Sequence, residues 1–226
     1  MRAQSGHGPV ALKKNSIVTL VVLMRLGILG GTFDPVHYGH LLMAETARES
    51  LHLDEVRFVP AVRSPLKSDD PGVDGHARAD MLQLAIAGCP GFVVDRRELR
   101  RSPPSYSIDT LRSLHAEFPS AQLVLILGAD SLRDFLRWKD PEEIVRLADI
   151  VACNRPGQPE LDQATIAGLI GAELAARVKP LQIPGTDISS TMLRARIRAG
   201  HSLRFLTPRA VEAFITEHRL YLPKNR

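Results

Sequence analysis

The sequence predicts an α/β fold: a single domain with one doubly wound, Rossmann-like parallel sheet and helices on both faces. Short apolar runs alternate along the chain with segments whose apolar residues recur at helical spacing. Polar, often glycine-containing loops follow the apolar runs. The length of 226 residues, 44% of them apolar, suits one such domain, which we place at residues 24–226.

The first half of the chain predicts four strands and three helices. Leu26 to Leu29 is a short apolar run that ends in two glycines, as a buried parallel strand would. Similar runs predict strands at 56–60, 92–94 and 123–127, and the last of these is unbroken enough to be central. Helical spacing of apolar residues predicts helices over 39–51, 76–87 and 108–118.

The second half repeats this alternation. A short helix is expected over 130–136, and Pro141 is well placed to begin another that ends at Leu147. The remaining elements are strands at 150–153 and, more weakly, 181–183, with helices over 161–177, 190–198 and 208–218. Strands separated by helices imply right-handed crossovers and therefore a parallel sheet.

Residues 1–23 are interpreted as an N-terminal extension, expected to be disordered, with Met24 as the natural beginning of the domain. The apolar run from Ile17 to Met24 is shorter than the about 18–20 residues of a membrane span, and no A-x-A cleavage site follows it. We therefore expect no membrane association. Two cysteines, Cys89 and Cys153, are too few for a disulfide framework, which favours the cytoplasm and two buried, inert thiols.

The charge balance is mildly basic, with 29 Lys and Arg residues against 25 Asp and Glu, a net charge of +4. The densest basic runs, Arg96-Arg97 and Arg100-Arg101, are interrupted by Glu98. A nucleic-acid surface would need more cations on one face together with aromatic residues, so we expect no nucleic-acid partner. A modest positive field suits a small anionic ligand such as a nucleotide.

Four loops should meet at the carboxyl edge of the sheet, where ligands bind in such folds. Each of them follows a predicted strand: Gly30–His40, Pro60–Lys67, Gly128–Ser131 and Asn154–Gly157.

The loop from Gly30 to His40 carries the strongest chemical signal. Gly30 and Gly31 let the backbone approach a phosphate, and Asp34-Pro35 favours a turn. His37 and His40 are three residues apart where a helix begins, so both imidazoles and the helix dipole can face one anion. The alternative without a catalytic role is a tight turn whose histidines are structural hydrogen-bonding residues. A zinc site lacks further ligands nearby, and the order of a Walker A loop is absent.

A second signal is the segment Ile188-Ser189-Ser190-Thr191-Met192-Leu193-Arg194. Hydroxyls at a helix start are ordinary N-caps. Arg194 lies one turn inside that helix, where it can reach an anion held near Ser190 and Thr191.

Together these two segments resemble the nucleotidyltransferase superfamily related to class I aminoacyl-tRNA synthetases. Residues 25–222 more narrowly resemble the bacterial nicotinate mononucleotide adenylyltransferase family. The narrower resemblance depends on several further segments: Arg78-x-x-Met81-Leu82, Glu98-Leu99-Arg100, Ser105-Tyr106-Ser107-Ile108-Asp109-Thr110-Leu111, Gly128-Ala129-Asp130-Ser131 with Trp138, and Arg155-Pro156-Gly157.

The resemblance implies transfer of AMP from ATP to nicotinate mononucleotide, with Mg²⁺ shielding the phosphates and no metal held by the protein itself. The catalytic residues would be His37, His40 and Arg194. The implied ATP and phosphate contacts are Gly30, Gly31, Thr32, Phe33, Lys67, Gly128, Asp130, Ser190 and Arg155. Thr110 would recognise the nicotinate carboxylate and Trp138 would lie against the pyridine ring, with Tyr106 and Asp109 nearby.

One departure weakens the assignments in the loop after the second strand. The family often has Pro-Pro-His-Lys there, whereas this chain has Ser64-Pro65-Leu66-Lys67, so no role of that histidine carries over. The alternatives without a binding role are that Trp138 is an aromatic residue used for packing and that Lys67 is a solvated cation.

Rival functions stay open at this stage. A sister transferase acting on phosphopantetheine or nicotinamide mononucleotide, or a cytidylyltransferase, would share His37, His40 and Arg194. A non-catalytic nucleotide-binding regulator is a third possibility. A synthetase fragment is disfavoured because the Lys-Met-Ser-Lys-Ser loop is absent. The oligomeric state, including a homo-oligomer, is left open.

Overall fold

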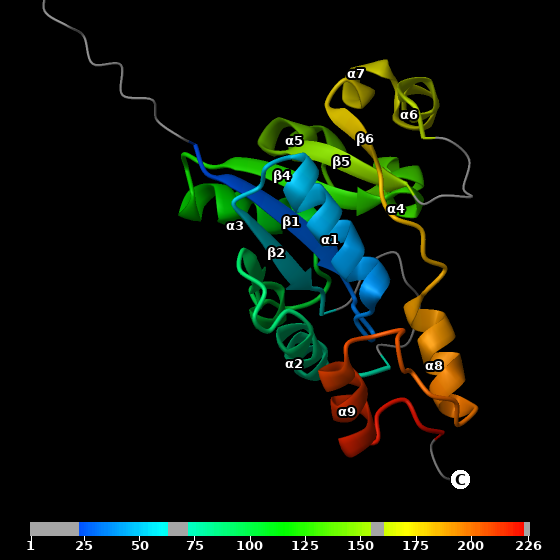
Figure 1. Cartoon of the computed structure of the whole chain (residues 1–226). Helices are drawn as coiled ribbons and strands as arrows, with labels where there is room; N and C mark the ends of the chain where they lie inside the picture. The colour runs from blue at the N-terminus through cyan, green and yellow to red at the C-terminus, as the bar shows by residue number, and fades with distance from the viewer. Residues whose placement is uncertain (1–22, 63–71, 155–160, 224–226) are drawn as a thin grey trace, which may run out of the picture.

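The protein is described here from a computed structural model, which places residues 23–62, 72–154 and 161–223. Within these residues the strands form one six-stranded sheet in the order β3-β2-β1-β4-β5-β6, and every neighbouring pair is parallel. The strands are β1 (Arg25–Gly31), β2 (Glu55–Pro60), β3 (Phe92–Val94), β4 (Gln122–Gly128), β5 (Asp149–Asn154) and β6 (Val178–Gln182). The predicted doubly wound parallel sheet is confirmed (Figure 1).

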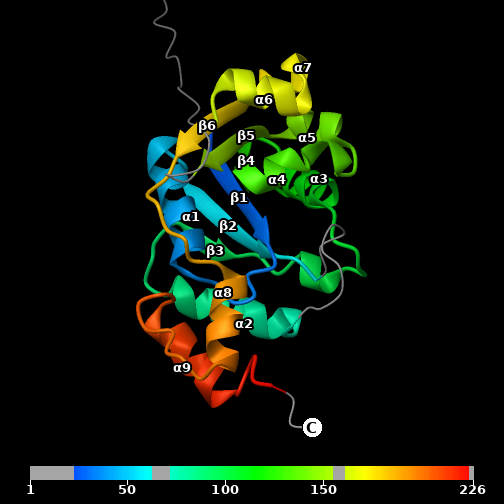
Figure 2. The ribbon, with the colours of Figure 1, turned by 90° about the vertical axis from the view of Figure 1, so that its right-hand side faces the viewer.

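Helices cover both faces of the sheet (Figure 2). Their bounds are α1 (Tyr38–Ser50), α2 (Gly75–Ala85), α3 (Ser107–Glu117), α4 (Ala129–Arg133), α5 (Pro141–Leu147), α6 (Gln163–Ile170), α7 (Ala172–Ala175), α8 (Ser190–Arg198) and α9 (Arg209–Glu217). One face packs against α1, α2, α8 and α9, and the other against α3 to α7. Helices α8 and α9 lie at the end of the molecule toward which β1 points (Figure 2).

Two apolar clusters form the core, one on each face, because successive residues of a strand point to opposite sides. In β4, Val124 and Ile126 join the cluster under α1, whereas Leu125 and Leu127 join the cluster under α3. A central strand that is apolar on both faces is what an unbroken apolar run predicts.

The sheet opens between β1 and β4 at its carboxyl edge. These strands pair from Arg25–Gln122 only as far as Ile28–Leu125. By contrast, β1 stays paired with β2 to Gly31–Pro60, and β4 with β5 to Gly128–Cys153. The order of strands reverses at this point, so the opening lies where a doubly wound sheet binds its ligand.

Three predicted elements differ from the structure. The helix expected over 161–177 is broken at Gly171, whose φ of +84° lies in the left-handed region that glycine adopts readily, and α6 and α7 result. The last strand covers 178–182 rather than 181–183, because Val178 pairs with Ile150 and Pro180 is tolerated in an edge strand. The short helix expected over 130–136 is α4 followed by a 3₁₀ turn, η2 (Phe135–Arg137).

The two cysteines differ in their surroundings. Cys153 is buried in β5, as expected, and burial raises the pKa of its thiol to about 12. Cys89 is exposed, contrary to the expectation, because it lies in the turn between α2 and β3. Within the described residues, no helix is both long and apolar enough to cross a membrane.

We expect Gly27→Ala to lower the free energy of unfolding by about 1–3 kcal/mol, since a Cβ there would overpack the core. That atom would lie 2.8 Å from Leu53 Cδ1 and 3.0 Å from Val56 Cγ2. Gly168→Ala on α6 is the matched control, because its Cβ would meet no described atom within 4 Å. Alanine should leave stability there unchanged or improve it by up to about 1 kcal/mol. Urea denaturation measures both, and equal midpoints would contradict this packing.

Candidate active site

The loop between β1 and α1 is shaped by two glycines and one strained phenylalanine. A Cβ on Gly31 would lie 3.2 Å from the ring of Phe33, and a Cβ on Gly39 would lie 3.0 Å from the ring of His37. Phe33 has a φ of +49°, and its buried ring packs edge-on to Phe58 and His40. An added Cβ on Gly30 would meet no described atom within 4 Å, which leaves space for a ligand beside the backbone.

His37 and His40 stack at the N-terminus of α1. His37 is the N-cap residue and is only 2% exposed, and His40 is the third helical residue. Their ring centroids are 3.8 Å apart, and the backbone N–H of His37 donates to Nδ1 of His40 over 3.3 Å. A neutral His40 that accepts at Nδ1 carries its proton on Nε2. His40 thus presents a hydrogen-bond donor at a helix end that favours negative charge.

Side chains from distant segments hold the backbone of this loop. Each donates to one of its carbonyl oxygens: Arg78 Nη1 to Thr32, Arg194 Nη1 to Asp34 (2.7 Å), Ser190 Oγ to Pro35 (2.9 Å) and Thr207 Oγ1 to Val36 (2.8 Å). The fixed loop backbone orients the two histidines.

Arg78 is a buried cation, 1% exposed, that joins three segments at the carboxyl edge. Besides Thr32, its guanidinium donates to the carbonyl oxygens of Ala61 (2.7 Å) and Val73 (3.0 Å). It therefore connects the ends of β1 and β2 with the start of α2. Burial lowers the pKa of Arg78, and the nearby charge of Asp34 opposes that shift.

Ser190 and Arg194 lie against the loop of residues 32–37 between β1 and α1, called the histidine loop below. The structure thus brings together the two segments that the sequence singled out. The N-cap of α8 is Ser189, whose Oγ accepts from the N–H of Met192 over 3.2 Å. Ser190 instead holds Pro35, and Arg194 also approaches the Asp34 carboxylate, with Nη1 4.0 Å from Oδ2. Both residues thus support the loop as well as standing beside it.

On the far side of the opening, the predicted residue Gly128 ends β4 and Asp130 lies in the helix that follows. Gly128 is the N-cap of α4. The side chain of Asp130 is 96% exposed and pairs with Arg133 at 2.6 Å.

A second group surrounds the N-terminus of α3. Lys139 Nζ lies 3.8 Å from Oδ1 of Asp109 and 4.7 Å from the ring centroid of Tyr106. The neighbouring Trp138 packs on Phe135, with ring centroids 5.6 Å apart. Its indole Nε1 is buried, and no residue in the described part of the chain accepts its hydrogen. The structure therefore brings Tyr106 and Asp109 close to the segment that carries Trp138.

Thr110 is buried in a polar network that the sequence did not indicate. Its Oγ1 donates to Glu98 Oε1 over 2.6 Å and accepts from Arg101 Nη2 over 2.6 Å. Ser105 Oγ accepts from the N–H of Val62, which connects this network to the end of β2. Burial raises the pKa of Glu98, although hydrogen bonds from Thr110 and Ser105 lower it in part.

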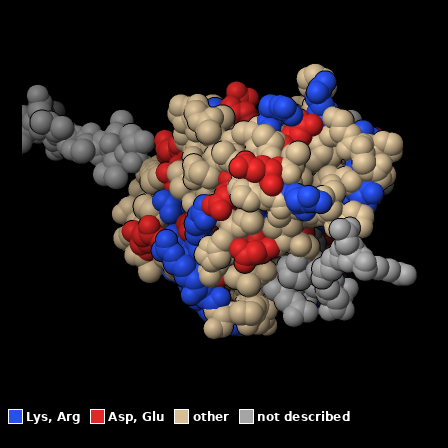
Figure 3. Space-filling view, turned by 90° about the horizontal axis from the view of Figure 1, so that it is seen from below, with Lys and Arg blue, Asp and Glu red and all other residues tan. Residues whose placement is uncertain are grey.

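Lys67, Arg155 and Leu66 lie outside the described residues. Among the residues that the structure places, no group of three or more His, Cys, Asp and Glu side chains could hold a metal ion. The end of the molecule that carries α8 and α9 shows a band of Lys and Arg side chains at one side, with both signs mixed elsewhere (Figure 3).

Comparison with known proteins identifies the family. The model of the cytidylyltransferase-like family matches residues 28–196. A Thermus thermophilus protein named "Probable nicotinate-nucleotide adenylyltransferase" is 46% identical over 88% of this chain and 100% of its own length. A protein of the same name from Rhodopirellula baltica is 42% identical over 87% of this chain and 92% of its own length.

This chain belongs to the nicotinate-nucleotide adenylyltransferase family. A solved structure has the same fold: the Plasmodium falciparum nicotinic acid mononucleotide adenylyltransferase complexed with NaAD, with a TM-score of 0.71 and 20% identity. The match covers 88% of this chain and 97% of that one.

Sequence reasoning gave Asp34 only a place in a predicted turn, and it gave no role to Arg78, Thr207 or Tyr221 in shaping this adenylyltransferase site. Arg78 was visible only as part of a family pattern. Thr207 and Tyr221 left no signal, because hydrogen bonds across 171 and 187 residues have no local pattern.

Stability should depend on pH through Glu98. Its folded-state pKa is raised above 4.5, so the native state binds more protons than the unfolded state and loses stability as pH rises through that window. We expect Glu98→Gln to gain stability relative to the native sequence as pH rises above 4.5, measured by urea unfolding at several pH values.

Asp95→Asn is the control, because the pKa of Asp95 is shifted in the opposite direction and stability should change with pH in the opposite sense. Burial raises the pKa of Asp95, but hydrogen bonds from Arg97 and Arg57 outweigh it and the net pKa is lowered from 3.8. The stability that this carboxylate supplies is present above 3.8 and lost as pH falls through its folded-state value. A Glu98→Gln difference that is flat with pH would refute the assigned burial effect.

Proposed function

We propose that the protein transfers the adenylyl group of ATP to the 5′-phosphate of nicotinate mononucleotide, which forms deamido-NAD and pyrophosphate in NAD biosynthesis. The observation that carries this proposal is the stacked pair of His37 and His40 at the N-terminus of α1, with Arg194 bonded to the same loop. The names of the curated relatives supply the acceptor. A second solved structure of the Plasmodium falciparum enzyme, complexed with APC, matches the fold of this chain with a TM-score of 0.70.

The reaction needs positioning and charge stabilisation rather than a covalent nucleophile. An oxygen of the mononucleotide phosphate bonds to the α-phosphorus of ATP. The bond between that phosphorus and the oxygen bridging to the β-phosphate breaks, and both electrons leave with pyrophosphate. Negative charge grows on the α-phosphate oxygens and on the leaving group.

His40 is assigned to the α-phosphate, because its Nε2 proton can be donated to a developing oxyanion. His37, almost fully buried beneath it, fixes its ring by stacking. Arg194 and Ser190 are assigned to the β- and γ-phosphates, and Gly30 and Gly31 to close backbone approach. The other ATP contacts we propose are Thr32, Phe33, Lys67, Gly128, Asp130 and Arg155.

The acceptor is assigned to the α3 side of the opening. The backbone N–H groups around Thr110 would recognise the nicotinate carboxylate, with Tyr106 and Asp109 in the same turn. The Thr110 hydroxyl, whose one proton is donated to Glu98, would hold that turn in place. Trp138 would offer its face to the pyridine ring. Its buried indole Nε1, which donates to no residue in the described part of the chain, supports a polar group standing nearby when substrate is bound.

Mg²⁺ is proposed as part of the substrate, bound to the phosphates of ATP. The described residues fit this arrangement, since imidazole, hydroxyl and guanidinium groups gather at the loop. Such groups suit phosphate oxygens, whereas Mg²⁺ prefers carboxylate and phosphate oxygen ligands. Bound Mg²⁺ supplies neutralisation of phosphate charge. We place the reaction in the cytoplasm, which the free thiols of Cys89 and Cys153 support.

We expect His40→Ala to lower kcat by about 10²–10³-fold, roughly 3–4 kcal/mol of lost transition-state stabilisation, without unfolding the protein. Pyrophosphate release from ATP and Mg²⁺ with nicotinate mononucleotide measures the rate. His115→Ala, an exposed histidine in the last turn of α3, is the matched control and should keep normal turnover. Near-normal turnover in His40→Ala would sink the catalytic assignment.

The acceptor is tested by offering nicotinate mononucleotide, its amide and phosphopantetheine separately. We expect kcat/KM to be highest for the acid mononucleotide, because a site built to bond a carboxylate leaves its donors poorly matched by an amide. Equal values for acid and amide would contradict the proposed carboxylate recognition. Release with phosphopantetheine alone would keep the triphosphate site and replace the acceptor.

A further inference from the structure

The C-terminal segment after α9 reaches back into the histidine loop through one side chain. Tyr221 is 8% exposed, and its hydroxyl donates to Oδ1 of Asp34 over 2.6 Å. Asp34 is itself 6% exposed and lies in the loop between Gly31 and His37. A donor–acceptor distance this short is typical of a hydroxyl bonded to a carboxylate.

The Asp34 carboxylate is the centre of a buried polar cluster. Arg194 Nη1 lies 4.0 Å from its Oδ2 and donates to the carbonyl oxygen of the same residue over 2.7 Å. A Cβ on Gly72 would stand 3.2 Å from Oδ2, so that segment packs directly against the carboxylate. Burial and the negative charge of Asp34 raise the pKa of Tyr221, so the phenol stays a donor at every physiological pH.

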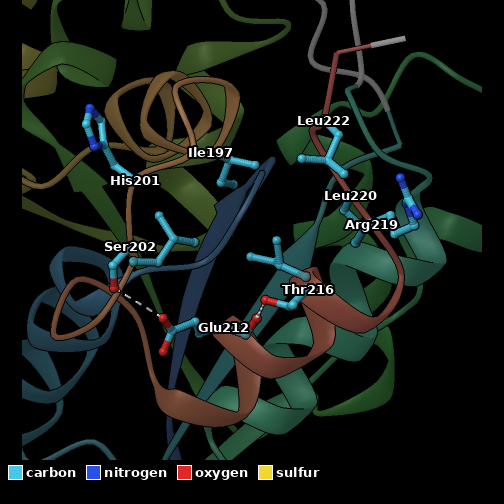
Figure 4. Close-up of a pocket in the computed structure, with 11 residues that line it drawn as sticks. Ile197, His201, Ser202, Glu212, Thr216, Arg219, Leu220 and Leu222 are labelled. Atoms are coloured by element: carbon cyan, nitrogen blue, oxygen red, sulfur yellow. Dashed lines mark hydrogen bonds between the residues drawn. The ribbon is translucent and has the colours of Figure 1, made fainter. Parts of the chain in front are cut away.

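Tyr221 differs from its two neighbours in the chain, because its side chain attaches this segment to Asp34. Leu220 and Leu222 line a hollow of about 230 Å³ between α8 and α9 (Figure 4), whereas Tyr221 between them bonds to Asp34. Tyr221 also has a φ of +63°, a left-handed conformation that is strained for a tyrosine. Such strain persists where surrounding contacts enforce it, often next to a functional site.

We propose that Tyr221 is a positioning residue for adenylyl transfer: through Asp34 it fixes the loop that orients His37 and His40 and the guanidinium of Arg194. The kinetic part of this proposal rests on the proposed function, transfer of AMP to nicotinate mononucleotide. Tyr221 touches no substrate in this role; it acts through Asp34. The segment after α9 thus helps to position the groups that we assign to the phosphates of ATP.

The test is Tyr221→Phe, which removes one hydroxyl and keeps the ring. We expect kcat for pyrophosphate release to fall by roughly 10- to 100-fold, since small misplacements of catalytic groups have effects of that size. The KM for nicotinate mononucleotide should stay within about twofold, because the acceptor contacts lie elsewhere. In an Arg194→Ala background the effect of Tyr221→Phe should shrink, because both act on the same loop.

Thr216→Val is the matched control. It deletes a hydroxyl from the same C-terminal unit, where Oγ1 of Thr216 donates to the carbonyl oxygen of Glu212 within its own helix (Figure 4). It should leave kcat unchanged. NMR of histidine-labelled protein gives a readout without turnover: the ring resonances of His37 and His40 should move in Tyr221→Phe and stay in place in Thr216→Val.

The outcomes separate the two proposals. If Tyr221→Phe is only less stable to heat, with native kcat and unmoved histidine resonances while folded, Tyr221 is structural and the inference is overturned. Equal effects of Tyr221→Phe with and without Arg194 also overturn it. If the native protein releases no pyrophosphate with nicotinate mononucleotide, the proposed function fails, and the histidine resonances alone decide the role of Tyr221.

Discussion

The guanidinium of Arg78 holds together three backbone segments that would otherwise end independently at the carboxyl edge of the sheet. It donates to the carbonyl oxygens of Thr32 just after β1, Ala61 just after β2 and Val73 just before α2. Five N–H donors in a rigid plane allow one side chain to satisfy several buried acceptors at once. Arg78 thereby fixes the start of the histidine loop. Three more side-chain donors hold the carbonyl oxygens of Asp34, Pro35 and Val36 farther along it.

The site is therefore assembled from parts of the chain that are distant in sequence. The opening between β1 and β4 arises because their pairing stops at Ile28–Leu125 while each strand stays paired on its other side. Helix α8 closes one side of the histidine loop through Ser190 and Arg194. The turn before α3 reaches the end of β2 through Ser105 and Val62. Each contact brings a different loop to the same edge of one rigid sheet.

The sequence was informative where structure is determined locally. Alternating apolar periods placed the strands and most helices, and the spacing of His37 and His40 placed both at a helix N-terminus, as observed. Helix breaking at Gly171 was missed because the flanking apolar residues keep helical spacing through it. Long-range hydrogen bonds were also missed, since nothing near Tyr221 in the sequence points to Asp34. The roles of the site residues toward substrates stay predictions.

The buried charges in this region fix the direction of their partners as well as contributing to stability. Well-packed apolar replacements of buried ion pairs are often neutral or stabilising. Asp34 and Arg78 differ from such pairs, because apolar side chains there would leave the Tyr221 hydroxyl and the three carbonyl oxygens bonded to Arg78 without these partners. An apolar side chain cannot hold a carbonyl oxygen at a fixed angle, and the loop has four such oxygens bonded in five residues. Preorganised donors lower a barrier only if they stay in place while charge develops. The polar cluster around Asp34 meets that requirement for an imidazole that must face a phosphate.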